Sequence, residues 1–252
     1  SNFRAGVNAG NSIASGGNYN VVVGDEAGTA ITTGDNNVVV GYAALVANTT
    51  GGNNVAIGQI ALDANTSGSF SVAVGNRALS ANTTAGGNVA VGADALLLTT
   101  TGTNNTAIGL SAMDANTTAS NNTALGANAL GANTTGFDNV AVGAASLDAN
   151  TTGDNNTAVG LNALTSNTTA DNNTAVGHDA LAANTEGFNN TAVGSFAMDA
   201  VTTGDYNTGL GVFALSGETT GAGSTALGYA ALVSQNSTNA ADMFNTAVGR
   251  ES

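Results

Sequence analysis

The sequence predicts an all-β fold, a parallel β-solenoid (β-roll) of 17-residue coils. A glycine recurs at this spacing without slippage from Gly24 to Gly228, since 228 − 24 = 204 = 12 × 17. Each glycine follows a short segment rich in Val, Thr and Ile, which favour β-structure. The chain has no Asn-Gly pair, the strongest hairpin signal, so parallel stacking of coils is favoured over hairpins. A repeat of this length suits two or three short strands with tight turns.

The repeats divide the chain into four segments. Residues 1–19 are expected to form an irregular first coil or N-terminal cap, because the degenerate copy "NFRAG" ends at Gly6, one position out of register with Gly24. Residues 20–232 are the array of 17-residue repeats. The last copy, "NTAVG" at 245–249, ends four positions beyond the register that Gly228 sets. We therefore expect an insertion loop at 233–244 and the start of a further repeat at 245–252.

The recurrent glycine is predicted to mark a corner of each coil that a Cβ atom would obstruct. These turn glycines are Gly24, Gly41, Gly58, Gly75, Gly92, Gly109, Gly126, Gly143, Gly160, Gly177, Gly194, Gly211, Gly228 and Gly249.

Strand alternation assigns the side chains to two faces. A branched aliphatic residue such as Val159 precedes each glycine, and we expect it to point into the coil together with the residue two positions earlier, such as Thr157. A second strand is expected after the glycine, with an inward column of Leu or Met that only Gly28 interrupts. This column comprises Leu45, Leu62, Leu79, Leu96, Met113, Leu130, Leu147, Leu164, Leu181, Met198, Leu215 and Leu232.

Alanine occupies the middle of the first strand, which this assignment turns outward. An outer face of nearly pure Ala is typical of a close-packed interface between copies of one chain. Two large apolar side chains per coil also bury little against an ordering cost of about 1–2 kcal/mol per residue, so the sequence predicts a homo-oligomer. The expected interface residues are Ala56, Ala73, Ala90, Ala107, Ala124, Ala141, Ala158, Ala175 and Ala192.

Asparagine opens most repeats, and stacked identical amides form hydrogen-bond ladders. This first Asn column comprises Asn20, Asn37, Asn54, Asn88, Asn105, Asn122, Asn139, Asn156, Asn173, Asn190, Asn207 and Asn245. A second set lies in Asn-x-Thr sequons, which would accept glycans in a glycosylating secretory route and are otherwise turn residues. These sequon residues are Asn48, Asn82, Asn116, Asn133, Asn150 and Asn167.

Composition argues against several function classes. The net charge is −14, with three Arg, no Lys and no Cys, which argues against nucleic-acid binding and against anionic membranes. No apolar run is long enough to insert in a membrane. The single histidine, His178, has no recurrent catalytic partner and is expected at the solvated surface, so the chain is predicted not to be an enzyme. No cofactor is expected, although Asp and Asn in turns such as 150–155 leave structural calcium open.

Two further surface hypotheses concern threonine and aromatic residues. Thr-Thr pairs such as those at 151–152 and 168–169 would stack into columns of the kind an ice-binding face needs, but adjacent residues point to opposite faces. Aromatic residues at variable turn positions cover the backbone or contact a glycan or receptor. They are Tyr42, Phe137, Phe188, Phe196, Tyr206, Phe213 and Tyr229.

The phrases "NVAIG", "SVAVG" and "NTAVG", each followed by "xxAL", resemble the head repeats of trimeric autotransporter adhesins. The longer phrase "ALxANTTGxNNTAVG" resembles repeats of phage and marine-virus tail-fibre proteins. The resemblance covers Asn20 to Gly249 and implies a left-handed parallel β-roll and a homotrimer. It also implies a non-catalytic fibre or attachment role outside the cell, on a virion or at a cell surface. The alternatives are a subunit of an extracellular filament and an ice-binding protein.

Overall fold

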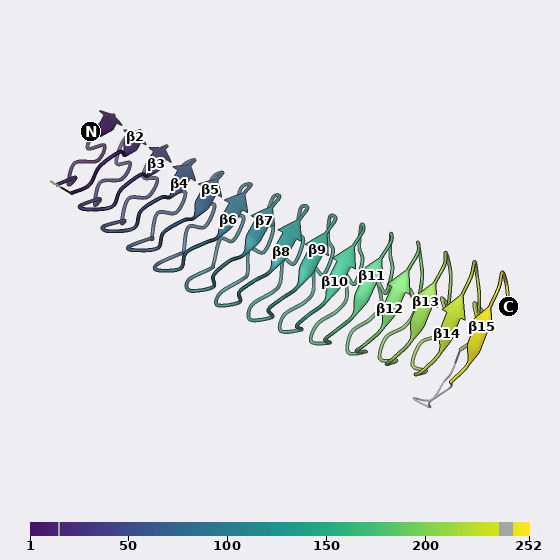
Figure 1. Ribbon diagram of the computed structural model, residues 1–252. Helices are drawn as coiled ribbons and strands as arrows, with labels where there is room; N and C mark the ends of the chain where they lie inside the picture. The colour runs from purple at the N-terminus through teal and green to yellow at the C-terminus, as the bar shows by residue number, and fades with distance from the viewer. Residues whose placement is uncertain (15, 237–243) are drawn as a thin grey trace. The chain divides into compact units, whose positions relative to one another are not determined.

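The computed structural model describes residues 1–14, 16–236 and 244–252. These residues form fifteen short strands and no helix. The strands are parallel and stack as a β-solenoid (Figure 1), and within each compact unit they pair with the equivalent strand of the next coil. The predicted fold class is confirmed.

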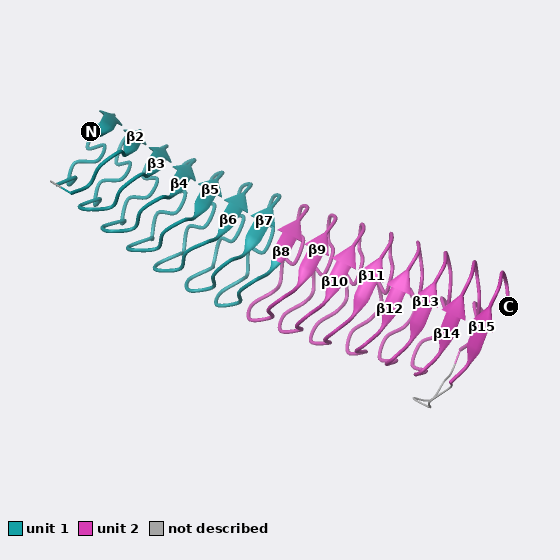
Figure 2. Ribbon diagram, viewed as in Figure 1, with its two compact units in different colours: residues 1–122 teal, residues 123–252 magenta. Residues whose placement is uncertain are grey.

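The chain divides into two compact units, residues 1–122 and residues 123–252 (Figure 2). Unit 1 contains β1 (Phe3–Ala5), β2 (Val21–Val23), β3 (Val38–Val40), β4 (Val55–Ile57), β5 (Val72–Val74), β6 (Val89–Val91) and β7 (Thr106–Ile108). Unit 2 contains β8 (Thr123–Leu125), β9 (Val140–Val142), β10 (Thr157–Val159), β11 (Thr174–Val176), β12 (Thr191–Val193), β13 (Thr208–Leu210), β14 (Thr225–Leu227) and β15 (Thr246–Val248).

The strand register follows the repeat in both units. Val72 lies opposite Val89 and Thr157 lies opposite Thr174, one full repeat further on. The first coil has one extra residue, since Phe3 pairs with Val21, yet its strand stacks regularly on β2. Thr225 pairs with Thr246, so the longer last spacing keeps the register as well. Most of the predicted insertion loop, residues 237–243, lies outside the described residues.

The prediction of a second strand after the glycine is wrong. The Leu column lies in tight turns whose residues take positive φ, for example 54° at Leu62 and 52° at Leu164. Such angles are uncommon for a branched side chain. The coils above and below hold this conformation, because the turn backbone hydrogen-bonds from coil to coil, as in the 3.0 Å bond from the Leu62 N–H to the Ala78 carbonyl. The Leu column is nevertheless inward, with Leu62 and Leu164 fully buried.

The strand faces are the reverse of the prediction. The central alanines of β4–β12 and β14 are fully buried, whereas flanking residues such as Thr157 and Val159 lie at the surface with partial exposure. The expected interface is therefore the core of the single chain. The nine residues concerned are Ala56, Ala73, Ala90, Ala107, Ala124, Ala141, Ala158, Ala175 and Ala192, all without exposed surface.

Limited space inside the coil favours small residues on the strand. The Leu or Met column reaches across, and the buried strand position is Ala or Gly in most coils, although Val39 is also buried in the coil of Leu45. At Gly209, which replaces the alanine, a Cβ atom would lie 2.8 Å from Cγ of Met198. The reverse exchange occurs in the coil of β2, where the buried strand residue is the larger Val22 and Gly28 replaces the leucine. A Cβ atom on Gly28 would lie 2.8 Å from Cδ1 of Ile31. The interior is thus filled by complementary volumes.

The turn glycines occupy the predicted corner. Gly160 and Gly177 have φ of 140° and 143°, a region that other residues rarely adopt. A Cβ on either would overlap the backbone carbonyl of the glycine in the next coil. The close stacking of coils therefore requires glycine at this position.

The first Asn column forms the predicted ladder, mainly through the backbone. Oδ1 of Asn156 accepts the backbone N–H of Asn173 at 2.9 Å, and Nδ2 of Asn156 donates to the Ala170 carbonyl at 2.8 Å. The residue before it, as at Asn155 and Asn172, takes φ of 58° or 60°, which Asn tolerates well. The Asn-Asn pairs thus combine a left-handed turn residue with a buried ladder residue.

The sequon asparagines form a second buried ladder, at positions that were predicted only as turn residues or glycan acceptors. Nδ2 of Asn150 donates to Oδ1 of Asn133 at 3.0 Å, and Nδ2 of Asn167 donates to Oδ1 of Asn150 at 2.9 Å. The six sequon residues Asn48, Asn82, Asn116, Asn133, Asn150 and Asn167 have no exposed surface. Glycosylation of these amides in the folded chain is therefore excluded by burial.

Candidate functional site

The outward residues of β2–β6 form an aliphatic surface that we call the strand face of unit 1. Val21, Val38 and Ile57 expose 38, 36 and 37% of their surface. Both outward columns are aliphatic throughout these strands, and neither contains a charge. The columns are Val21, Val38, Val55, Val72 and Val89 before the buried residue, and Val23, Val40, Ile57, Val74 and Val91 after it.

The strand face of unit 2, formed by β8–β15, differs in one column. The residues after the buried position remain aliphatic, as Val159 and Leu210 illustrate. The residues before it are threonine in every strand except β9, where Val140 stands. The threonine column comprises Thr123, Thr157, Thr174, Thr191, Thr208, Thr225 and Thr246.

Two kinds of threonine are distinguished by their hydrogen bonds. In the turn, the hydroxyl of Thr151 donates to the Thr168 carbonyl at 3.0 Å, and that of Thr202 donates to the Thr219 carbonyl at 3.0 Å. Within the described residues, the hydroxyls of the strand threonines from Thr157 to Thr225 have no protein partner. The turn hydroxyls are thus used to join coils, whereas the strand hydroxyls are available to solvent.

Aromatic side chains form a row on the turns of unit 2. The rings of His178 and Phe196 meet edge to face at 5.1 Å, and those of Phe196 and Phe213 stack at 5.3 Å. Tyr229 follows at 6.3 Å, with the Arg250 guanidinium 5.4 Å from its ring centre. Nδ1 of His178 lies 3.2 Å from the carboxylate of the next residue. His178 is at the surface, as predicted, and belongs to this row.

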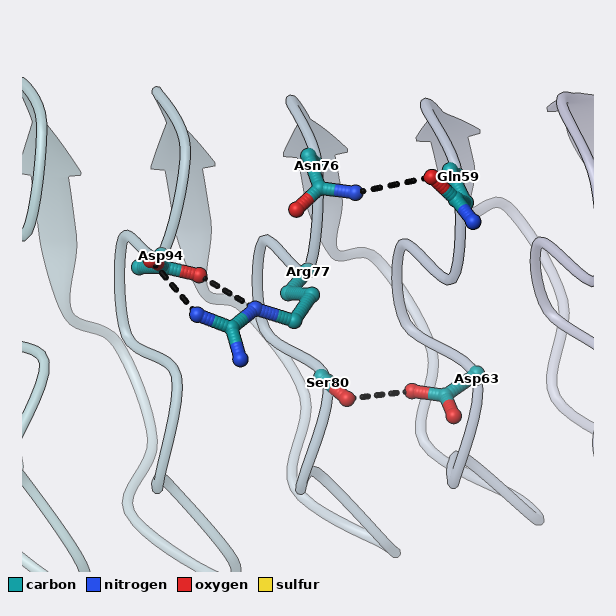
Figure 3. A network of polar contacts seen from close by, with 6 residues as sticks. All are labelled: Gln59, Asp63, Asn76, Arg77, Ser80 and Asp94. Atoms are coloured by element: carbon teal, nitrogen blue, oxygen red, sulfur yellow. Dashed lines mark hydrogen bonds and ion pairs between the residues drawn. The ribbon is translucent and has the colours of Figure 1, made fainter.

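Polar side chains join neighbouring coils on the turns of unit 1 (Figure 3). Arg77 makes two contacts with Asp94, at 2.7 and 2.8 Å. The Asn76 amide donates to the Gln59 amide oxygen, and the Ser80 hydroxyl donates to the Asp63 carboxylate, again from one coil to the next. Exposed ion pairs of this kind contribute little to stability, so this network reinforces the stacking without forming a site. The residues drawn are Gln59, Asp63, Asn76, Arg77, Ser80 and Asp94.

Acidic turn residues of unit 2 cap the backbone of the preceding coil. Oδ1 of Asp154 accepts the Phe137 N–H at 2.9 Å, and Oδ1 of Asp171 accepts the Asp154 N–H at 2.8 Å. Partial burial raises the pKa of Asp154, and the charges of Asp171 and Asp138 raise it further against that hydrogen bond. Structural calcium at these turns stays a prediction.

Two other carboxyl groups of unit 2 are perturbed by burial. Desolvation raises the pKa of Asp148 and, above all other causes, that of Asp199. One carboxyl oxygen of Asp199, Oδ1, is buried without a hydrogen-bond partner. Ionisation of Asp199 is therefore less favourable in the folded chain than in the unfolded chain.

Within residues 1–14, 16–236 and 244–252 there is no pocket, and no three His, Cys, Asp or Glu side chains gather where a metal ion could bind. The same residues contain no helix of the length and apolarity needed to cross a membrane. No protein-family model matches the chain, and no curated protein matches it.

Neither strand face was predicted, because the expected alternation placed their side chains inside. One signal was present in the repeats themselves. The position before the buried residue changes between Val and Thr, that is, between an apolar and a polar side chain of similar shape. A buried threonine without a partner would have been costly, so this change indicates an outward position.

Proposed function

We propose that this chain is a non-catalytic structural protein of a fibre that associates with its own copies, most simply as a homotrimer, and serves attachment. The observation that carries the proposal is the strand face of unit 1. Its ten aliphatic side chains in five coils form an uncharged apolar surface, and such surfaces are typical of protein interfaces. The resemblance of the repeats to adhesin heads and tail fibres supports three chains and a location outside the cell, on a virion or at a cell surface.

The strand face takes the place of the alanine columns as the association surface. Stacking in register brings Val55, Val72 and Val89 into one row, so the same face on another copy finds equivalent side chains at the same spacing. Burial of apolar area contributes about 25 cal/mol per Å² before the costs of association are met. Self-association therefore grows with the number of coils in contact.

The mass of the chain in solution tests this proposal. We expect a particle of three chains by light scattering, three times the 24.2 kDa of one chain. Val55→Lys with Val72→Lys would place two charges on the strand face and reduce the mass to one chain. The matched control, Ser67→Lys with Thr84→Lys, carries the same charges on exposed turns and retains the trimer.

The outcomes separate the alternatives. A monomeric wild-type chain, or a face variant that keeps its mass with an unchanged circular dichroism spectrum, overturns association through this face. Open-ended particles in electron microscopy would favour the filament subunit over the discrete trimer.

The aromatic row of unit 2 is the candidate contact for a surface glycan or receptor within the same proposal. Tyr229 is 47% exposed and lies beside Phe213 and Arg250, so apolar and cationic groups lie together. Binding of the chain to a glycan array is expected to weaken with Tyr229→Ala and to persist with Tyr42→Ala, an exposed tyrosine of unit 1. Equal binding by both variants would exclude the row as the contact.

A further inference from the structure

The threonine column of unit 2 is the feature that fibre association leaves unexplained. Five consecutive strands, β10–β14, each place a threonine before the buried residue and an aliphatic residue after it. Thr191 and Thr208 are exposed, and Thr157, Thr174 and Thr225 are partly exposed. The column therefore presents hydroxyl and methyl groups to solvent in every coil.

The hydroxyls of this column are regularly spaced. Thr157, Thr174, Thr191, Thr208 and Thr225 lie opposite one another in strict parallel register. Neighbouring strands lie about 4.8 Å apart, so the hydroxyls repeat at this interval. Small buried residues and the first Asn column maintain the register beneath them, and the second Asn ladder adds hydrogen bonds as far as Asn184. The regular spacing of the surface hydroxyls thus follows from the register of the buried residues.

The same hydroxyls are free to bind water. Within the described residues they have no protein partner, in contrast to the turn threonines, whose hydroxyls donate to backbone carbonyls. A second copy of the chain would be a poor occupant here, because a hydroxyl buried without a partner in a dry interface loses its hydrogen bond to water and gains none in return. Water satisfies each hydroxyl without this cost.

The chemistry of the face suits ordered water in particular. Methyl and isopropyl groups cannot hydrogen-bond, so the water over them bonds to itself, while each hydroxyl fixes one water molecule beside them. The columns contain no charged side chain from β10 to β14 that would orient water otherwise. Hydroxyls repeated at the strand interval hold that water in ranks, close to the repeat of oxygen atoms on a plane of ice.

We propose that the strand face of unit 2 binds ice through its ranks of threonine and aliphatic side chains. The Thr-Thr turn pairs are not the ranks involved, since the first hydroxyl of pairs such as 151–152 and 168–169 donates to a backbone carbonyl. The ice-binding ranks are instead the Thr-x-Val and Thr-x-Leu triplets of the strands.

Thermal hysteresis and inhibition of ice recrystallisation by the purified chain test the proposal. The wild-type chain is expected to show both. Thr174→Tyr with Thr191→Tyr would raise two bulky rings from the plane, and we expect the activity to be lost. The control, Thr152→Tyr with Thr169→Tyr, changes exposed turn threonines in the same unit and is expected to retain it. Thr174→Val with Thr191→Val removes only the hydroxyls and is expected to reduce the activity.

Circular dichroism and light scattering of each variant accompany the ice measurements. Absence of hysteresis in the wild-type chain overturns the proposal, and so does equal loss in the face and turn variants. A face variant whose mass changes while ice activity stays the same also overturns it, because the face would then be a protein interface. Trimer formation through unit 1 is read from the mass alone, so failure of either proposal leaves the other testable.

Discussion

The two units are built from coils of the same design and differ in one column of their strand faces. Beneath the face, both contain buried alanine, inward leucine or methionine, corner glycine and two Asn ladders. Above it, strands β2–β6 of unit 1 carry Val at the position where unit 2 carries mostly Thr, and Thr106 already occupies this position in β7 of unit 1. Valine and threonine have the same shape and differ in a methyl and a hydroxyl. The outward columns therefore change in polarity between the units, while the buried strand residues stay apolar in both.

The largest effect is expected where a substitution disrupts what the units share. Ala73→Leu in β5 and Ala175→Leu in β11 overfill the coil and should each cost about 1–3 kcal/mol of unfolding free energy or more. Val74→Leu and Val176→Leu change the adjacent outward residue and should stay within about 0.5 kcal/mol. Urea unfolding measures all four. Equal midpoints for the inward and outward variants would contradict the assignment of the faces.

Exchanging the outward columns between the units tests their separate roles. Val55, Val72 and Val89 replaced by Thr in unit 1 would bury three unpaired hydroxyls on association, and the dissociation constant should rise by roughly tenfold or more. Thr174, Thr191 and Thr208 replaced by Val in unit 2 should strengthen self-association instead. Sedimentation equilibrium measures both constants. A change of the same sign in the two exchanges would refute the division of roles.

A smaller difference lies in the first Asn column, where each unit has one serine. Oγ of Ser71 is buried without a partner, whereas Oγ of Ser224 accepts a 3.0 Å hydrogen bond from Gln235. Ser71→Asn supplies an amide for the Ala85 carbonyl and should stabilise the chain by about 1 kcal/mol. Ser224→Asn should give no gain. Chemical denaturation decides, and a gain at both sites would show that Gln235 does not satisfy Ser224.

The smallest expected effect is a pH dependence contributed by unit 2. Burial raises the pKa of Asp148, Asp154 and Asp199 above the ordinary value of 3.8, so their ionised forms destabilise the folded chain. This cost is absent below the ordinary value and appears as the pH rises through the raised values. The melting temperature should therefore increase as the pH falls through the raised pKa values toward the ordinary one. Asp199→Asn should weaken this trend. An unchanged slope in Asp199→Asn would contradict the assigned role.

Much of the coil could be predicted from periodicity. The spacing of Gly160 and Gly177 gives the circuit length, and their lack of a Cβ gives the corner. Leu164 lies inward as predicted, because a column of large apolar residues has no better place than the interior. The ladder of Asn156 and Asn173 also follows from identical residues stacked in register.

The candidate surfaces could not be predicted in the same way. Alternation requires that Ala158 point away from Thr157 and Val159, but it does not say which side is the interior. Asn150 is equally compatible with a turn, and Leu164 in a left-handed turn contradicts its local preference. These features depend on contacts with the coils above and below.

The sequence by itself determined the all-β class, the 17-residue coil, the glycine corner and the first Asn ladder, because β-forming residues, glycine and asparagine recur in register. Which face of the strand forms the core was settled only by packing in three dimensions. The reason is volume and polarity: beside an inward Leu or Met the strand position is Ala or Gly in most coils, although Val39 is also buried there, and a threonine hydroxyl buried at that position would need a partner. The aliphatic columns of unit 1 and the threonine column of unit 2 therefore lie at the surface, where both proposals locate the function.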